Sequence, residues 1–213
     1  MSRNIGPKCR LCRREKVKLF LKGDRCYTGK CALEKKAYLP GQQGKKGKKI
    51  TKLSEYGLRL REKQKVKRIY GMNEAQFKRF FSMAKRKPGI TGEYLLKLLE
   101  RRLDNTVYRS GFSASRAGAR QLVLHGHILV NNKKVNISSY ILKPNDVIEV
   151  KEKSKNLKAI KTNIEKVKER GGITYNWLEV NLDELKTVFK RAPEETETGL
   201  IVEKQLIVEF YKK

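Results

Sequence analysis

The feature of this sequence that most limits how the chain can fold is its positive charge. It has 51 Lys and Arg residues against 22 Asp and Glu residues, which gives a net charge of +29 over 213 residues. Self-repulsion of this size opposes a compact state unless an anionic partner neutralises it. Apolar residues make up 38% of the chain, which is still enough for a modest core. We therefore expect a binder of polyanions rather than an ordinary soluble metabolic enzyme.

The charge is concentrated toward the N-terminus. Residues 1–50 carry a net charge of +13 and residues 51–100 carry +8, whereas residues 151–213 carry only +3. No stretch approaches the roughly 20 mostly apolar residues of a transmembrane helix, and the N-terminus lacks an apolar signal core. Nucleic acid in a reducing compartment is the favoured partner. The alternative, a basic membrane-surface protein, should show a basic amphipathic helix.

All four cysteines lie within the first 31 residues, at Cys9, Cys12, Cys26 and Cys31, in the pattern C-x2-C-x13-C-x4-C. The two-residue and four-residue gaps let paired thiolates face one ion, and four thiolates suit tetrahedral Zn2+. An iron–sulfur cluster also takes four thiolates and is the lesser option. Free cysteines or two disulfides are the remaining alternatives, and an intracellular setting disfavours disulfides. The pattern predicts an N-terminal zinc-binding module.

A segment rich in glycine and lysine follows at residues 40–54. Its glycines disfavour a stable helix or strand. A polar, strongly cationic segment of this kind cannot bury enough apolar surface to fold alone. We expect a flexible arm that becomes ordered on nucleic acid.

Three helical patterns occur between residues 55 and 103. The first, Glu55–Tyr70, is so rich in Lys and Arg that it lacks an apolar stripe, and we expect it to lie on a polyanion. The second starts at Asn73 and contains Phe77 and two further phenylalanines at helical spacing, which favours a core role over base stacking. The third starts at Thr91, and its apolar face runs to Leu103.

Residues 101–152 have the pattern of a small helix-and-sheet unit. Ser113 can cap a helix that ends at Leu124, and β-like runs occupy 127–130, 134–137 and 147–150. No Cys, Asp or Glu lies near the two histidines between the helix and the first run. A structural role or an RNA contact is therefore expected for them, rather than metal binding.

The central module resembles the S4-type RNA-binding domain, which occurs in a ribosomal protein, some pseudouridine synthases and some aminoacyl-tRNA synthetases. The residues that carry the resemblance are Arg101–Asn105, Tyr108-Arg109, Gly111-Phe112, Ser115-Arg116, Ala119–Val123, His125–Ile128 and Val130-Asn131.

The rest of the chain is similar to the uS-four family of bacterial-type small-subunit ribosomal proteins. This similarity is carried by Gly6-Pro7 with the four cysteines, Pro40–Gln42, Leu60–Lys65, Arg68–Gly71 and Leu206–Tyr211. Asn132 and Asn145 stand where the family usually has turn glycines. Because asparagine tolerates a left-handed backbone, we expect both turns to persist.

The resemblance implies an α+β fold class with three parts. A mostly helical, discontinuous domain is expected at 51–100 and completed by 171–213. A small α/β S4-type RNA-binding domain is inserted at 101–170. The N-terminal four-cysteine module and its basic arm occupy 1–50.

The resemblance also implies a function. The chain would be a structural constituent of the small ribosomal subunit, cytoplasmic and ribosome-bound, and not an enzyme. It would bind small-subunit ribosomal RNA directly at a multi-helix junction, early in assembly. Its other expected contacts are the neighbouring ribosomal protein S-five and mRNA on the path by which it enters the subunit, with an effect on translational accuracy. Some members of the family repress translation of their own operon.

A-form RNA offers shape, phosphates and 2′-hydroxyls rather than base edges, so recognition is expected to be electrostatic and geometric. The candidate RNA-binding residues are Arg3, Arg13, Arg14, Lys45, Lys46, Arg59, Arg61, Lys63, Arg68, Arg109, Ser115, Arg116, Arg120, His125 and His127.

Two other classes of protein require patterns that can be sought in this sequence. An RNA-modifying enzyme such as a pseudouridine synthase would need a separate catalytic domain with a nucleophilic Asp. A zinc-finger DNA regulator would need a recognition helix after its Cys or His site. The sequence shows neither pattern.

Overall fold

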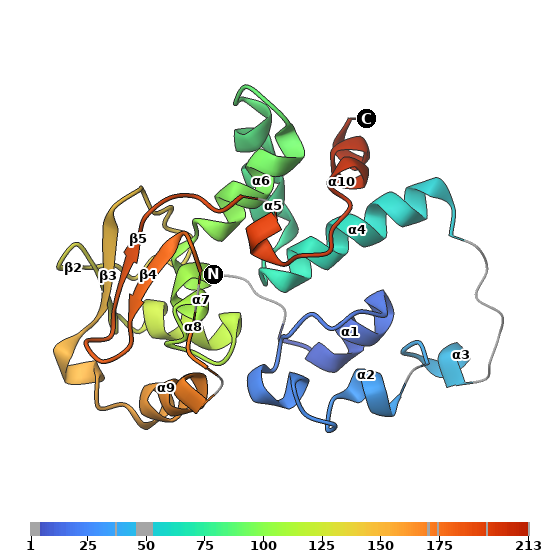
Figure 1. Cartoon of the computed structure of the whole chain (residues 1–213). Coiled ribbons are helices and arrows are strands. Elements are labelled where there is room, and N and C mark those ends of the chain that lie inside the picture. The colour runs from blue at the N-terminus through green and yellow to red at the C-terminus, as the bar shows by residue number, and fades with distance from the viewer. Residues whose placement is uncertain are drawn as a thin grey trace. The chain divides into compact units, whose positions relative to one another are not determined.

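The computed structural model of the chain describes residues 5–36, 38–45, 53–169, 171–173, 175–194 and 196–212, without the side chains of residues 43 and 45. The chain forms two compact units (Figure 1). Unit 1 comprises Met1–Gly92 and Ile201–Lys213, and unit 2 comprises Glu93–Leu200. Unit 2 therefore interrupts unit 1 in the sequence.

Unit 1 is helical. Its elements are α1 (Lys8–Glu15), a 3-10 turn (Gly23–Cys26), α2 (Ala32–Lys35), α3 (Gln42–Lys45), α4 (Glu55–Ile69), α5 (Glu74–Lys85) and α10 (Lys204–Tyr211). Side chains fix the starts of the two long helices. Ser54 Oγ accepts a hydrogen bond from the backbone N–H of Gly57 at 3.2 Å, and Asn73 Oδ1 accepts one from Gln76 at 2.8 Å.

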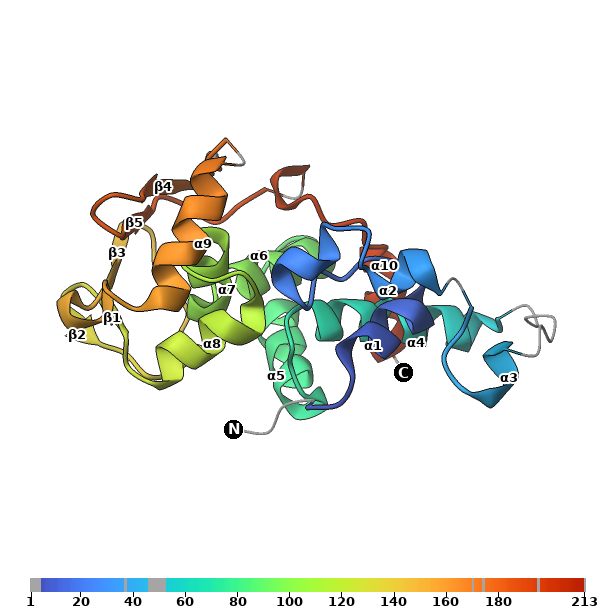
Figure 2. The same ribbon diagram turned by 90° about the horizontal axis from the view of Figure 1, so that it is seen from below.

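The core of unit 1 confirms the aromatic prediction. Phe77 and the two phenylalanines that follow it on α5 are buried. The C-terminal helix α10 packs beside α4, as Figures 1 and 2 both show. Its Ile207 is buried, and the ring of Tyr211 stacks on Phe81 with the centroids 4.4 Å apart. Helix α4 is therefore part of the packed interior, with Val66 and Ile69 buried.

The segment at 40–54 differs from its prediction. Residues 42–45 form the short helix α3, although the glycines were expected to prevent one. A Cβ atom on Gly44 would collide with the backbone carbonyl of Leu39. The glycine thus permits a close backbone approach that sequence alone does not show. Residues 46–52 of the predicted arm lie outside the described residues.

Unit 2 combines helices with one antiparallel sheet. Its helices are α6 (Thr91–Glu100), which begins two residues earlier, α7 (Leu103–Arg109), α8 (Arg116–Leu124) and α9 (Lys158–Glu169), with 3-10 turns at Glu152–Ser154 and Thr196–Thr198. Its strands are β1 (Ile128–Val130), β2 (Lys133–Lys134), β3 (Asp146–Val150), β4 (Leu178–Asn181) and β5 (Lys186–Phe189). The strand order is β2-β1-β3-β5-β4, and every pair is antiparallel.

One face of this sheet carries the core of unit 2. Alternate residues of β3 are buried, and Ile148 pairs with Val130 on β1 and with Thr187 on β5. Helices α7, α8 and α9 pack on one side of the sheet, as Figure 2 shows, and contribute Val107, Val123, Ile160 and other apolar side chains to the same cluster. The turns at Asn132 and Asn145 persist with φ angles of 62° and 67°, as expected.

Three local predictions in unit 2 need correction. The helix from Thr91 ends at Glu100, because Arg102 adopts an extended backbone (φ −69°, ψ 137°) and α7 starts directly after it. The cap of α8 is Ser115 rather than Ser113, since Ser115 Oγ accepts from the N–H of Gly118 at 3.2 Å. Of the run expected at 134–137, only Lys134 lies in a strand, the two-residue β2.

The boundary after residue 170 also differs from the prediction. Residues 171–200 were assigned to the helical domain, but the structure groups them with unit 2. The hairpin of β4 and β5 extends the sheet beside β3, and it buries Leu178 and Phe189 in that core. Only residues 201–213 return to unit 1.

Within the described residues, no helix is both long enough and apolar enough to cross a membrane.

Candidate nucleic-acid interface

The four cysteines converge within unit 1. Cys9 and Cys12 lie on α1, Cys26 is the last residue of the 3-10 turn, and Cys31 directly precedes α2. All four line one pocket, and none forms a disulfide. The backbone N–H of Lys22 donates to Cys26 Sγ at 3.4 Å. The short first helix and its turns thus bring together thiols from three separate segments.

Burial raises the pKa of the Cys12 thiol, and the charges of the three other cysteines raise it further. A bound cation would offset that repulsion, so the chemistry of the donor set suits a four-thiolate metal site. Across the described ranges, however, no three or more His, Cys, Asp or Glu side chains are placed so that they could hold a metal ion. The structure does not support the predicted zinc-binding module, and zinc stays a prediction.

The candidate RNA-binding residues nearest the cysteines, Arg13 and Arg14, differ from each other in burial and contacts. Arg13 donates from Nη2 to the backbone carbonyls of Tyr38 and Leu39 at 2.9 and 3.2 Å, and its guanidinium lies 4.4 Å from the centroid of the Tyr38 ring. Arg13 therefore holds a chain segment in place. Arg14 is exposed. Arg3 and Lys46 lie outside the described residues, as does the side chain of Lys45.

The basic side chains of α4 are directed to carboxylates of unit 1 rather than left open to solvent. Arg59 Nε donates to Glu209 on α10 at 2.9 Å. Lys63 pairs with Glu74 on α5 at 2.7 Å, with its side chain only 5% exposed, and its ammonium lies 4.4 Å from the centroid of the Phe210 ring. These contacts stay within unit 1 and do not test an RNA contact, so the expectation that α4 lies on a polyanion stays a prediction. They stabilise the packing of α4 against α5 and α10.

Glu15, the last residue of α1, forms ion pairs with two other candidate RNA-binding residues. Its carboxylate pairs with Arg61 at 3.3 Å and with Arg68, and the Glu15 side chain is only 2% exposed. Burial raises the pKa of this carboxyl while both guanidinium groups act to lower it. The pair joins the cysteine-bearing segment to α4. Arg61 and Arg68 therefore have a structural role, while the single negative charge of Glu15 offsets only one of their two positive charges.

Unit 2 contains a buried charge network around Asp104 on α7. Its carboxylate accepts hydrogen bonds from Arg102 at 3.0 and 2.8 Å and from Arg120 at 3.0 and 2.6 Å. The side chains of Asp104, Arg102 and Arg120 are 3%, 0% and 8% exposed. Arg120, which was predicted to contact RNA, is buried and fastens α8 to α7 in this structure.

Arg109 at the end of α7 also has internal partners. It pairs with the buried carboxylate of Glu100 at 3.2 Å and donates from Nη2 to the backbone carbonyl of Thr198 at 2.8 Å. Its guanidinium lies 5.2 Å from the centroid of the Tyr175 ring. These contacts join three segments of unit 2, so Arg109 acts within the fold.

The N-terminus of α8 positions two further candidates. Ser115 is the helix cap described above. Arg116 is half-buried, donates from Nε to Asn105 Oδ1 at 2.7 Å and lies with its guanidinium 4.6 Å from the centroid of the Tyr108 ring. Unlike the buried Arg120, Arg116 is partly exposed at the surface of unit 2.

A cationic surface is formed by His125, His127, Lys134 and Lys151, and we call it the histidine patch. The two imidazole rings lie 6.0 Å apart between centroids. The backbone N–H of Lys151 donates to the carbonyl of His127 at 2.9 Å. The side chain of Lys134 passes over the glycine between the histidines, where a Cβ would collide with it. His125, Lys134 and Lys151 are exposed, so the structure brings both predicted histidines together with two lysines that the sequence analysis missed.

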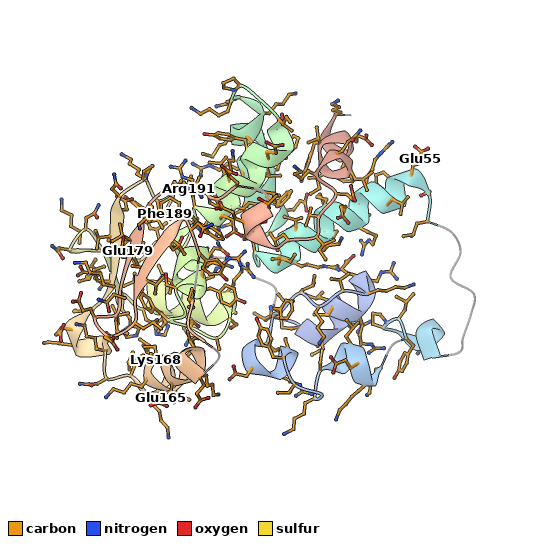
Figure 3. The ribbon with its side chains drawn as sticks, in the orientation of Figure 1. Glu55, Glu165, Lys168, Glu179, Phe189 and Arg191 are labelled. Carbon is orange, nitrogen blue, oxygen red and sulfur yellow. The ribbon has the colours of Figure 1, made fainter. Side chains whose placement is uncertain are left out.

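Other exposed basic residues were also missed. In unit 1 they include Lys85 at the end of α5 and Arg86 and Lys87 directly after it, and in unit 2 they include Lys133, Lys153, Lys158 and Lys161. Some exposed lysines are paired with acids. Lys168 on α9 lies 2.5 Å from Asp183, and Lys190 lies 3.0 Å from Glu179; Figure 3 labels Lys168 and Glu179. Exposure and pairing, which decide what a cation can bind, are properties of the fold.

Comparison with known proteins assigns a family to the N-terminal part of the chain and to its central module. Residues 3–100 match the ribosomal protein S4/S9 N-terminal domain, and residues 101–148 match the S4 domain. The chain is 56% identical to the small ribosomal subunit protein uS4 of Thermodesulfovibrio yellowstonii, 54% identical to that of Thermotoga maritima and 51% identical to that of Thermus thermophilus. Each match covers 100% of both chains, and these relatives are ribosomal proteins rather than enzymes.

The resemblance noted in the sequence is thereby confirmed. It extends from the cysteine-bearing segment through the mixed helix-and-sheet unit to the C-terminal helix, with no part of the chain left over. The chain belongs to the uS4 family of small ribosomal subunit proteins.

Proposed function

We propose that this chain is a structural component of the small ribosomal subunit that binds small-subunit ribosomal RNA directly. The observation that carries the proposal is the full-length identity of 51–56% to small ribosomal subunit proteins uS4. The net charge of +29 supports it, since a polyanion is the partner that such a charge requires.

In unit 2, RNA binding falls to the surface cations rather than to the buried ones. Arg116 and the histidine patch lie at the two ends of α8. The ion pair of Arg120 with Asp104 joins α8 to α7, while Arg109 ties α7 to Glu100 and Thr198, and together they fix where these surface groups stand. Rigid spacing matters, because A-form RNA is recognised through the geometry of its phosphates and 2′-hydroxyls.

The proposal has finer parts that the family resemblance suggests. The RNA site is a multi-helix junction, bound early in assembly. The bound chain contacts the neighbouring ribosomal protein S-five and lies near the path by which mRNA enters, where it supports translational accuracy. Repression of its own mRNA is a further suggested activity.

Salt dependence of binding to a transcript of small-subunit ribosomal RNA tests the RNA proposal. The logarithm of the affinity should fall linearly with the logarithm of the salt concentration. Replacing both Lys134 and Lys151 with glutamine should reduce the magnitude of this slope by about 1.5, because each lost phosphate contact removes roughly 0.7–0.9. The matched control replaces Lys168 and Lys190, which remove the same charge but are already paired with acids, and should leave the slope unchanged. An affinity that does not depend on salt would contradict the proposal.

We further propose that the four cysteines hold Zn2+, with an iron–sulfur cluster as the lesser alternative. The pocket that all four line and the lack of disulfides support this proposal. Bound metal would supply a cross-link between α1, the 3-10 turn and the start of α2, in a segment too short to build a core of its own.

Elemental analysis of protein purified without chelator tests the metal proposal. We expect one zinc per chain, and the Cys26→Ser and Cys31→Ser variants should lose it. A chelator should then lower the melting temperature of the wild-type chain but not that of the variants. Protein that contains neither zinc nor iron would refute the proposal.

A further inference from the structure

Phe20, which is half-buried, and Tyr27, which is exposed, form an aromatic pair beside the cysteines of unit 1. Their ring centroids lie 5.0 Å apart with an interplanar angle of 31°. Tyr27 remains 56% exposed. A tyrosine ring carries a large apolar face that packing normally covers, and aromatic residues that combine an apolar body with a polar tip are typical of binding surfaces.

The backbone is held in an uncommon conformation where it positions this pair. Phe20 has a φ angle of 51°, in the left-handed region that bulky side chains rarely adopt. Its neighbour Leu19 is buried and anchors the segment, while the backbone N–H of Tyr27 donates to the carbonyl of Asp24 at 3.0 Å. Such strain persists only where the surroundings impose it, and it concentrates at functional sites.

The charges around the pair indicate the kind of ligand. Lys22, Arg25 and Lys30 are exposed, and Asp24 is the single acidic residue between positions 16 and 33. An aromatic platform flanked by cations is what single-stranded nucleic acid requires, because bases stack on the ring while phosphates meet the cations. A continuous A-form helix does not offer a base face, since its bases are stacked on one another.

We propose that Tyr27, supported from below by Phe20, is a stacking site for an unpaired RNA base, with Lys22, Arg25 and Lys30 contacting the adjacent phosphates. This inference rests on the proposed RNA binding and adds the class of RNA element that unit 1 recognises. A loop, bulge or junction nucleotide offers the required free base. Direct contact of Tyr27 with a base is sequence-tolerant, because every base has a π-face.

Tyr56 provides a matched control within the same unit. It is also 56% exposed and also contacts a phenylalanine, Phe210, at 5.7 Å between centroids. Its charged neighbours, however, include the carboxylates of Glu55 and Glu209, which share Arg59 as their one ion-pair partner among the described residues and so leave an excess of negative charge that opposes a phosphate backbone. Comparing substitutions of the two tyrosines therefore distinguishes the loss of a base-stacking site surrounded by cations from the loss of an exposed aromatic ring in general.

The test compares the full chain on two probes of equal length and charge, an RNA strand of about ten nucleotides and an abasic strand. Wild type and the Tyr56→Leu variant should bind the strand with bases about 5- to 150-fold more tightly than the abasic strand, as expected for one stacked base. Tyr27→Leu should lose this preference and Tyr27→Phe should keep it. The salt slope for ribosomal RNA should be the same in all four proteins, which shows that each is folded and still binds phosphate.

Two results would overturn the stacking site. One is equal binding of both strands by wild type, and the other is a base preference that survives in Tyr27→Leu. Either result, obtained while wild type still binds the ribosomal RNA transcript with the expected salt slope, rejects the stacking site and leaves the proposed function intact. Failure of wild type to bind that transcript at all would instead reject the proposed function.

Discussion

Replacing Asp104 with asparagine should strongly destabilise unit 2 and leave its surface unchanged. The carboxylate is the shared acceptor of two buried guanidinium groups, which approach to 2.8 and 2.6 Å. Asparagine has nearly the same shape, so no cavity is created. The substitution removes the negative charge and leaves two buried positive charges next to a neutral amide, one of whose ends is itself a donor.

The expected cost follows from the burial of all three side chains. Removing one partner of a buried ion pair costs about 3–5 kcal/mol, because it leaves a charge in the interior without its counter-charge. Total stabilities of domains are only about 5–15 kcal/mol, so this loss is a large fraction of the whole. With an m-value of about 1.5 kcal/mol/M in urea for a unit of this size, the midpoint of unfolding should fall by about 2–3 M.

Urea unfolding, followed by the fluorescence of Trp177 in the core of unit 2, measures this shift. The matched control is Asp183→Asn, which removes the same charge from a surface pair with Lys168 whose side chains are 83% and 52% exposed. That pair should contribute less than about 0.5 kcal/mol, because solvent screens it. If Asp104→Asn unfolds at the same urea concentration as the control, the buried network does not hold unit 2 together and the reasoning is refuted.

Three further changes follow from single contacts. Thr187→Val should stabilise unit 2 by about 1 kcal/mol in urea melts, because the buried Oγ1 has no hydrogen-bond partner among the described residues. Burial acts to raise the pKa of Glu74, but hydrogen bonds from two lysines and a tyrosine hold it at about 2, below the usual 4.5. The stabilisation from Glu74 is therefore present above pH 4.5 and lost as the pH falls toward 2, and Glu74→Gln should flatten this part of a thermal-melting profile against pH. Gly111→Ala should lower the melting temperature, because φ is 75° and a Cβ would lie 2.5 Å from Ile173 Cδ1.

The sequence predicted those features that depend on neighbouring residues. Asn73 caps α5 as expected, because a cap acts over three residues. The left-handed turns at Asn132 and Asn145 were also predictable from the conformational preference of one residue type. The family was identified from motifs spread along the chain, and these are local patterns as well.

The fate of the charges was not predictable in the same way. Arg120 and Asp104 lie sixteen positions apart, and only the packing of α8 on α7 makes them partners. Arg61 meets Glu15 across forty-six positions for the same reason. The basic residues that cover most of α4 therefore suggest, from sequence alone, a helix that binds a polyanion. In the fold, Arg61 and Arg68 of this helix pair with the buried carboxylate of Glu15. Hairpin β4–β5 was missed as part of the sheet because its pairing partner, β3, is distant in sequence.

The C-terminal helix determines the order in which the chain can complete its fold during synthesis. All residues of unit 2 emerge as one continuous stretch before α10 is made. Helix α4 is translated much earlier, yet the rings beside its Lys63 belong to Phe210 and Tyr211. The unit whose translation begins first is thus finished last, because Lys63 gains its ring contacts only after residues 210 and 211 have been made. A nascent chain stalled before residue 204 would carry a complete unit 2 and an open unit 1.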